Sequence, residues 1–148
     1  IIGAEERITV TTKLCLLWQN ALTGQWYHVG DLILKDSGVY AFKYKASDEP
    51  KGLSEALKNG YQLHPTFPEI DKEYESSFLF SAFARRLPER KRKDYVPILA
   101  ELGITQQSTD FELLAATGGR LNSDTYEFVS PNSAELLLNS SDQQQYNK

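Results

Sequence analysis

The chain has 148 residues, a formal net charge of −4 and a single cysteine. This length is enough for one domain to bury about two-thirds of its unfolded surface without a disulfide or a structural metal, and the negative charge disfavours a surface given over to nucleic acid. No stretch reaches the roughly 18 apolar residues that span a bilayer, and Ile1–Arg7 has no basic region leading into an apolar core, so the sequence predicts a cytoplasmic protein.

The first third of the chain has the pattern of an antiparallel sheet. Residues Ile8–Ala21 are rich in strand-forming residues, and the apolar run Leu14–Trp18 predicts an inner strand covered on both faces. Further strands are predicted over Trp26–Leu34 and Val39–Tyr44, joined by a turn in which Gly38 takes a positive φ. These three strands would form a meander. Alternation in the third strand predicts three aromatic residues that face the core: Tyr40, Phe42 and Tyr44.

The middle of the chain changes to helical periodicity. Lys45–Pro68 is predicted to be an ordered loop with one helical turn at Leu53–Leu57. A helix capped by Ser76 or Ser77 is expected to run to Leu87, with an apolar face that includes Phe78, Leu79, Ala82 and Phe83. A second helix is expected to start at Pro88 and to end at Gly103, with Pro97 either kinking it or confining its regular part to later residues. Its apolar stripe consists of Tyr95, Ile98, Leu99 and Leu102.

A third helix has the clearest boundaries. Thr109-Asp110-Phe111-Glu112 matches a capping box, and Gly118-Gly119 is expected to form a C-cap and turn rather than an anion-binding nest. A strand follows at Tyr126–Val129. Asn132–Leu138 is predicted to be a short helix, and the polar residues after it a flexible tail.

These elements predict an α+β fold, in which a small antiparallel sheet, made of the meander and the C-terminal strand, packs with three or four short helices. Residues 1–130 are expected to form the domain, and residues 131–148 the short helix and tail.

The sequence contains no motif of a catalytic or cofactor-binding site. We find no P-loop, no G-x-G-x-x-G and no H-E-x-x-H, so no catalytic residue and no cofactor is expected. His28 and His64 are far apart, and with only one cysteine no metal site is predicted either. Cys15 lies in the apolar run of the first strand and is interpreted as a buried thiol.

Two features are candidates for partner binding. The first is a run of basic residues, which consists of Arg85, Arg86, Arg90, Lys91, Arg92 and Lys93. It has three interpretations: a solvated face, a contact for an acidic protein, or a contact for nucleic acid. Because this run carries no interleaved aromatic residues for base stacking, direct nucleic-acid binding is disfavoured. The second is Trp26, which follows a turn and is either a core anchor or an exposed interface anchor.

The order of elements resembles the N-terminal subdomain of HipA-type Ser/Thr kinases. The resemblance rests on a strand with Trp18, a strand with Val29-Gly30-Asp31-Leu32 and a strand with Phe42-Lys43-Tyr44. It also includes a helix that ends in Leu-Pro within Phe78–Lys93, and a Leu-Leu-x-x-x-Gly segment at Leu113–Gly118.

The resemblance implies a toxin–antitoxin system of bacteria. In the two-gene form, the subdomain is fused to a kinase that uses ATP and magnesium, and a DNA-binding HipB-like antitoxin holds the kinase. In a three-gene form, the subdomain is a separate, HipS-like antitoxin that binds a shortened kinase.

Three hypotheses follow. The first is a non-enzymatic antitoxin that restrains a HipA-like kinase toxin, with a HipB-like DNA-binding protein as a further member of the complex and no contact with nucleic acid or membrane. The second is an accessory N-terminal fragment of a full HipA-like kinase. The third is a nucleic-acid-binding module that uses the basic run.

Overall fold

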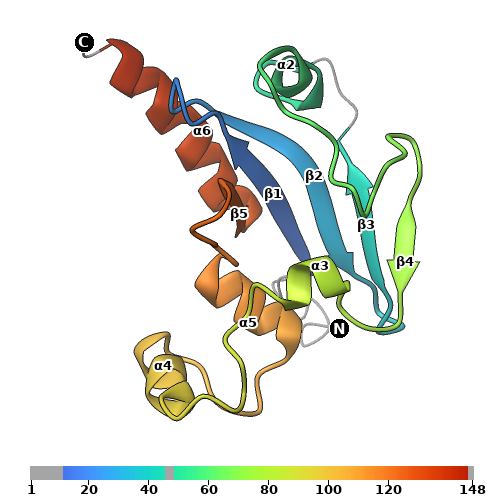
Figure 1. Cartoon of the computed structure of the whole chain (residues 1–148), viewed down its shortest axis with the longest axis vertical. Coiled ribbons are helices and arrows are strands. Elements are labelled where there is room, and N and C mark those ends of the chain that lie inside the picture. The colour runs from blue at the N-terminus through green and yellow to red at the C-terminus, as the bar shows by residue number, and fades with distance from the viewer. Residues whose placement is uncertain (1–11, 46–48, 147–148) are drawn as a thin grey trace, which may run out of the picture.

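A computed structural model describes residues 12–45 and 49–146 of the chain, with side chains as far as Asn139. Its centre is a five-stranded antiparallel sheet with the strand order β4-β3-β2-β1-β5 (Figure 1). The strands are β1 (Lys13–Gln19), β2 (Trp26–Leu34), β3 (Tyr40–Tyr44), β4 (Tyr74–Ser76) and β5 (Tyr126–Val129). The predicted meander is confirmed as β1-β2-β3, and the part of the first strand predicted over residues 8–11 lies outside the described residues.

Five described helices surround this sheet, so the α+β fold class is confirmed (Figure 1). They are α2 (Leu53–Lys58), α3 (Ser81–Ala84), α4 (Tyr95–Glu101), α5 (Asp110–Thr117) and α6 (Pro131–Tyr146). Buried residues of α2, α3 and α5 join the main core on one face of the sheet, whereas α6 covers the other face. The short α4 packs on α5 away from the sheet. None of the helices in the described part of the chain has the length and apolar character needed to cross a bilayer.

Strand β1 is the inner strand that its continuous apolar run predicted. Leu14 and Leu16 face the main core, while Cys15 and Leu17 face α6, and all four are buried. Strand β1 has a neighbouring strand at each edge and other side chains packed on each face. Its residues are therefore apolar on both faces, and its sequence shows no alternation of polar and apolar residues. The prediction that Cys15 is a buried thiol is confirmed.

Aromatic rings fill the main core. The three aromatic residues of β3 are buried as predicted. The centre of the Phe42 ring lies 4.5 Å from the centre of the Phe67 ring and 5.5 Å from that of the Phe83 ring. Phe83 of α3 also contacts Phe128 of β5, with 4.8 Å between ring centres. Gly30 makes this packing possible, because a Cβ at that position would lie 2.7 Å from the Phe42 ring.

The capping box of α5 is confirmed in full. The Thr109 hydroxyl accepts a hydrogen bond from the Glu112 N–H at 3.1 Å, and the Glu112 carboxylate accepts one from the Thr109 N–H at 2.7 Å. The helix ends at Gly118, whose φ of 76° is left-handed, as a glycine C-cap requires. The Gly118 carbonyl then accepts a hydrogen bond from Phe128 at 2.8 Å, which joins the end of α5 to β5.

The predicted helix from Ser76 or Ser77 to Leu87 is wrong. Tyr74–Ser76 instead forms β4, which pairs with β3 at the edge of the sheet, and the Ser76 hydroxyl accepts the Phe78 N–H in a turn. The helix is confined to the four residues of α3, and Phe78 is 80% exposed. Ser76 is engaged in β4 and does not cap the helix, which instead begins after Phe80 without a side-chain cap.

Two further helix boundaries also differ from the prediction. The helix expected at Pro88 begins only at Tyr95, with Pro97 in its first turn, where the missing N–H breaks no hydrogen bond. This confirms that Pro97 confines the regular helix rather than kinking it. The C-terminal helix continues past Leu138 to Tyr146, through residues that the sequence predicted to be a tail.

Phe83 and Phe78 form a matched pair for testing the core. Phe83→Ala should lower the free energy of unfolding by about 3–5 kcal/mol, because it empties a site that four other phenylalanine rings surround. Phe78→Ala should leave the stability nearly unchanged because that side chain is exposed. Urea denaturation measures both values, and an equal loss in the two variants would contradict this description of the core.

Candidate partner-binding surface

The structure separates the six basic residues into three groups. Arg86 is buried and holds a loop in place, Arg90 and Arg92 are exposed but paired with acids, and the remaining three are exposed and form no ion pair with an acid among the described residues. The sequence treated the six as one surface. Only the tertiary structure shows how each charge is used.

Arg86 does not belong to the exposed surface, and its place in the predicted contact is therefore corrected. Its side chain is 5% exposed and forms a bidentate ion pair with Asp124, in which Nη2 donates to Oδ2 and Nη1 donates to Oδ1 at 3.2 Å. Nη1 also donates to the Gly119 carbonyl at 3.0 Å, and the guanidinium lies 5.2 Å from the centre of the Tyr126 ring. A planar guanidinium satisfies these partners together, which an ammonium group cannot do.

This contact depends on the glycine at position 119. Gly119 has a φ of 60°, and a Cβ there would lie 2.6 Å from Leu114 and 3.2 Å from Phe128. A side chain would therefore displace the turn whose carbonyl Arg86 binds. We call the Arg86 contacts with Gly119, Asp124 and Tyr126 the Arg86 clamp. It fastens the loop between α5 and β5 to the end of α3.

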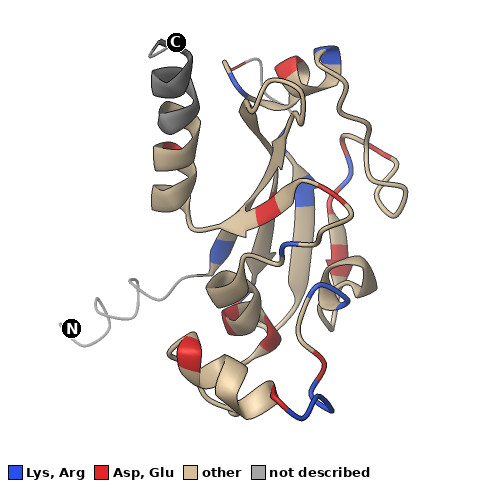
Figure 2. Ribbon diagram, turned by 60° about the vertical axis from the view of Figure 1, so that its left-hand side comes forward, with Lys and Arg blue, Asp and Glu red and all other residues tan. Residues whose placement is uncertain are grey.

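Arg90 and Arg92 are partly neutralised by nearby acids. Arg90 donates to the Asp110 carboxylate and to the Tyr95 hydroxyl, both at 3.2 Å, and Arg92 donates twice to Asp94 at 2.9 Å. Figure 2 shows basic and acidic segments alternating along the chain between α3 and α4. The positive electrostatic potential of this segment is therefore weaker than that of six adjacent unpaired cations.

Three cations of the run remain available to a partner. Arg85, Lys91 and Lys93 are exposed, and within the described part of the chain no ion pair joins them to an acid. Arg85 stands at the C-terminal end of α3. Lys91 and Lys93 lie in the connection before α4.

Two grooves flank the loop that the Arg86 clamp holds. The first groove has a volume of about 340 Å³, and its lining includes Arg85, His64, Leu121 and Asp124. The second has a volume of about 180 Å³, and its lining includes Trp26, Arg120, Leu121 and Asp124. Leu121 and Asp124 line both, so the grooves lie on either side of one loop. We call this region, with Arg85, Lys91 and Lys93, the clamp surface.

His64 adds hydrogen-bonding capacity to the first groove rather than charge. Burial, together with the nearby positive charges of Arg86 and Arg85, lowers the pKa of its imidazole. Its Nδ1 accepts a hydrogen bond from the Thr66 N–H at 3.1 Å, which leaves Nε2 as the donor of the neutral ring.

Trp26 has features of both a core anchor and an exposed interface anchor. It begins β2 and packs, half-buried, against the cluster of Cys15, Leu17 and Val129 beneath α6. The same residue lines the second groove, next to Arg120. A tryptophan with one side against the core and the other in a groove is well placed to act as an interface anchor.

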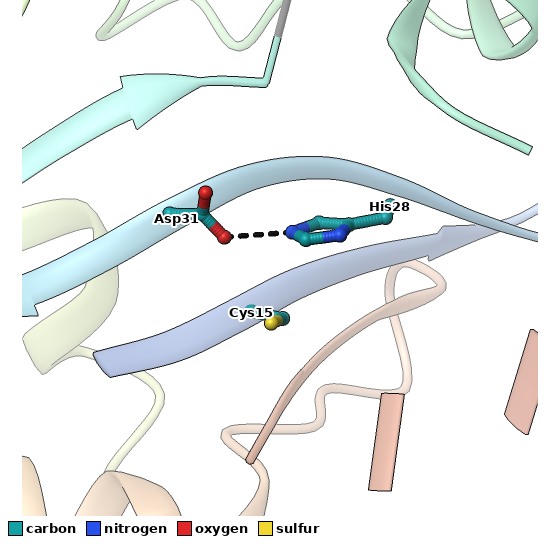
Figure 3. Close-up of side chains that lie close together, drawn as sticks. All are labelled: Cys15, His28 and Asp31. Carbon is teal, nitrogen blue, oxygen red and sulfur yellow. Dashed lines mark hydrogen bonds and ion pairs between the residues drawn. The ribbon is translucent and has the colours of Figure 1, made fainter. Parts of the chain in front are cut away.

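A cluster of potential metal ligands lies elsewhere, on the α6 face of the sheet. Cys15, His28 and Asp31 place their sulfur, nitrogen and oxygen atoms within 4.8 Å of one another (Figure 3). His28 Nε2 is 2.7 Å from Asp31 Oδ1, and Lys13 Nζ is 3.7 Å from Asp31 Oδ2. The sequence analysis predicted no metal site, because the two histidines are far apart in the chain and there is only one cysteine. On a regular strand Asp31 would face away from His28, three positions earlier.

The sequence analysis missed the residues between α5 and β5. Asp124 and Leu121 gave no signal, since an isolated acid in a polar loop is ordinarily solvated. Their role depends on Arg86, which lies 38 positions from Asp124.

A comparison with protein families matches residues 22–122 to the HipA N-terminal domain, and the chain belongs to that family. The matched segment contains β2 to α5, and therefore includes Arg86 and Gly119 of the clamp. Comparisons with curated proteins and with solved structures found no match.

The Arg86 clamp makes a prediction about stability. Asp124→Ala leaves a buried guanidinium without its carboxylate and should lower the free energy of unfolding by about 3 kcal/mol, the low end for a buried pair because Asp124 is 30% exposed. Asp94→Ala, which breaks the exposed pair with Arg92, should leave the urea midpoint nearly unchanged. Equal midpoints for the two variants would show that the clamp does not hold the fold.

Proposed function

We infer that this protein is a non-catalytic regulator that binds a HipA-like Ser/Thr kinase toxin and restrains it, as an antitoxin of a bacterial toxin–antitoxin system. The observation that carries the proposal is its membership of the HipA N-terminal domain family. The sequence has no phosphate-binding or magnesium-binding motif of its own, which supports action by contact in the cytoplasm rather than by catalysis.

The clamp surface is the docking site in this proposal. It consists of two grooves, one lined in part by Arg85 and the other by Trp26, together with the exposed Lys91 and Lys93, which form no ion pair within the described residues. Exposed positive charges at an interface rim speed association with an acidic partner, while a tryptophan seated in a pocket contributes to the strength of the complex. The partner is therefore a kinase with an acidic patch beside an apolar recess. A HipB-like DNA-binding protein would join through the kinase.

The pairing of charges supports a protein partner over nucleic acid. A nucleic-acid contact gains affinity from each cation that neutralises a phosphate. Here Arg86 is buried against Asp124, and Arg90 and Arg92 already have carboxylate partners, so half of the run is engaged within the chain.

The test uses a HipA-like kinase that lacks its own N-terminal subdomain. Added in trans, the intact chain should bind this kinase and lower its rate of Mg-ATP-dependent substrate phosphorylation, and the chain alone should turn over no ATP. Restored or increased kinase activity would instead identify the chain as an accessory part of a full kinase. Duplex DNA at about 50 mM salt, where phosphate contacts are strong, should not bind.

Charge reversal tests the cationic part of the surface. Lys91→Glu with Lys93→Glu should slow association with the kinase by about tenfold or more at low salt, because the steering charges change sign. The control reverses two exposed lysines elsewhere on the chain, Lys58 of α2 and Lys72 before β4, where Lys72 is paired with Glu69, and should leave the association rate close to that of the unaltered chain. Surface plasmon resonance at low and high salt measures the rates. The same slowing in both double variants would assign the effect to net charge and contradict a localised docking site.

Trp26 has a separate test. Trp26→Ala should weaken kinase binding by more than about 1 kcal/mol, because it removes the anchor from the second groove. Leu137→Ala is the control, since Leu137 is also partly buried against the cluster beneath α6 but does not line that groove. Both variants should lose some stability, and only Trp26→Ala should lose affinity. If folded Trp26→Ala binds the kinase with unchanged affinity, Trp26 is a core residue and not an interface anchor.

A further inference from the structure

A β-bulge brings three metal-binding side chains to one place on the sheet. Leu16 pairs with Gly30 and Leu17 pairs with His28, so Val29 is an extra residue on β2. In a regular strand, residues three apart face opposite sides of the sheet, but the extra residue places both His28 and Asp31 on the α6 face. Asp31 pairs directly with Cys15 on β1. Bulges are frequent beside functional sites because they re-aim side chains in this way.

We propose that Cys15, His28 and Asp31 bind a divalent transition-metal ion of the zinc class. A thiolate, an imidazole and a carboxylate are the ligand types that zinc takes in proteins, and three such ligands leave a fourth tetrahedral position for water. The site is on the opposite face of the sheet from the main core and does not depend on the proposed docking of a kinase.

The spacing of the three groups fits such an ion after small side-chain movements. Zinc bonds of about 2.0–2.3 Å place neighbouring tetrahedral ligand atoms about 3.3–3.6 Å apart. His28 Nε2 and Asp31 Oδ1, now 2.7 Å apart, would separate by about 0.6 Å as the metal replaces the shared hydrogen. The Cys15 sulfur, within 4.8 Å of both, would move inward by at most about 1.3 Å. Figure 3 shows the His28 ring and the Asp31 carboxylate pointing toward each other above Cys15.

The charges of the ligands are also offset in the occupied site. One doubly charged cation offsets the thiolate and the carboxylate, and the Lys13 ammonium adds one positive charge at the more exposed edge of the cluster. Lys13 lies by the second oxygen of Asp31 and is half-exposed, so it orients the carboxylate without occupying the position of the metal. In the metal-free protein, burial raises the pKa of Cys15 to about 11, and the bound ion would displace the thiol proton.

The composition of the chain makes the test selective. The whole sequence contains one cysteine and two histidines, so any thiolate–metal bond must come from Cys15, and His64 is the only other imidazole. His64 lies in the first groove of the clamp surface and is not part of the Cys15–His28–Asp31 cluster. His64→Gln is therefore the matched control for His28→Gln.

The experiment titrates the full chain, without an added histidine tag, with Co²⁺ and then with Zn²⁺. Bound Co²⁺ should give a near-ultraviolet thiolate-to-metal charge-transfer band together with the intense visible bands of tetrahedral cobalt, and Zn²⁺ should displace it at one equivalent. Cys15→Ser should remove the charge-transfer band. His28→Gln and Asp31→Asn should each weaken Zn²⁺ binding at least about tenfold by calorimetry, whereas His64→Gln should bind as the unaltered chain does.

The spectrum of the unaltered chain decides the question even where a variant fails to fold. A folded chain that saturates with neither ion, or that binds Co²⁺ without a thiolate band, would overturn the proposal. Zn²⁺ binding that His64→Gln removes would also overturn it, because the ion would then sit at the other histidine. Zn²⁺ should raise the melting temperature of the unaltered chain, and no rise at saturating Zn²⁺ would likewise contradict a site in the folded state.

Discussion

The buried guanidinium of Arg86 is the contact on which the candidate binding surface depends. It joins the residue after α3 to the Gly119 carbonyl, to Asp124 and to the ring of Tyr126 in β5. A buried cation is tolerated only where its donors are satisfied, and this one is satisfied by groups from a single loop and the strand that follows it. The clamp therefore fixes the loop whose two sides form the grooves, and a loop without it would present neither groove in a defined shape.

The burial of Arg86 also determines how the neighbouring charges act. Because Arg86, Arg90 and Arg92 each have a carboxylate partner, the electrostatic character of the segment rests on Arg85, Lys91 and Lys93. Of these three, Arg85 lines the first groove, whereas Lys91 and Lys93 lie in the connection before α4. The kinase partner proposed above rests on membership of the HipA N-terminal domain family, and the pairing of these charges does not bear on which protein binds.

The opposite face of the sheet depends on a different constraint, the bulge at Val29. The resemblance to HipA-type subdomains rests partly on Val29-Gly30-Asp31-Leu32 and Phe42-Lys43-Tyr44, and the structure connects these two segments. Gly30 leaves room for the ring of Phe42 in the main core, while the bulge turns Asp31 toward Cys15 and His28 beneath α6. Two adjacent positions of β2, Val29 and Gly30, thus serve the polar cluster of one face and the packing of the other.

Short-range patterns in the sequence were enough to predict most of the secondary structure. Strand-forming residues between turns located β2 and β3, the apolar run located β1, and the Thr109 capping box with Gly118 bounded α5, because each depends on interactions within a few residues. The sequence did not predict β4, which pairs with β3, or the exposure of Phe78 that follows from it. The pairing of Arg86 with Asp124, and of Cys15 with Asp31, was likewise decided by the tertiary structure. Burial and charge pairing between residues distant in the chain leave no mark on residue spacing, so only the folded arrangement distinguishes a clamp from a solvated arginine.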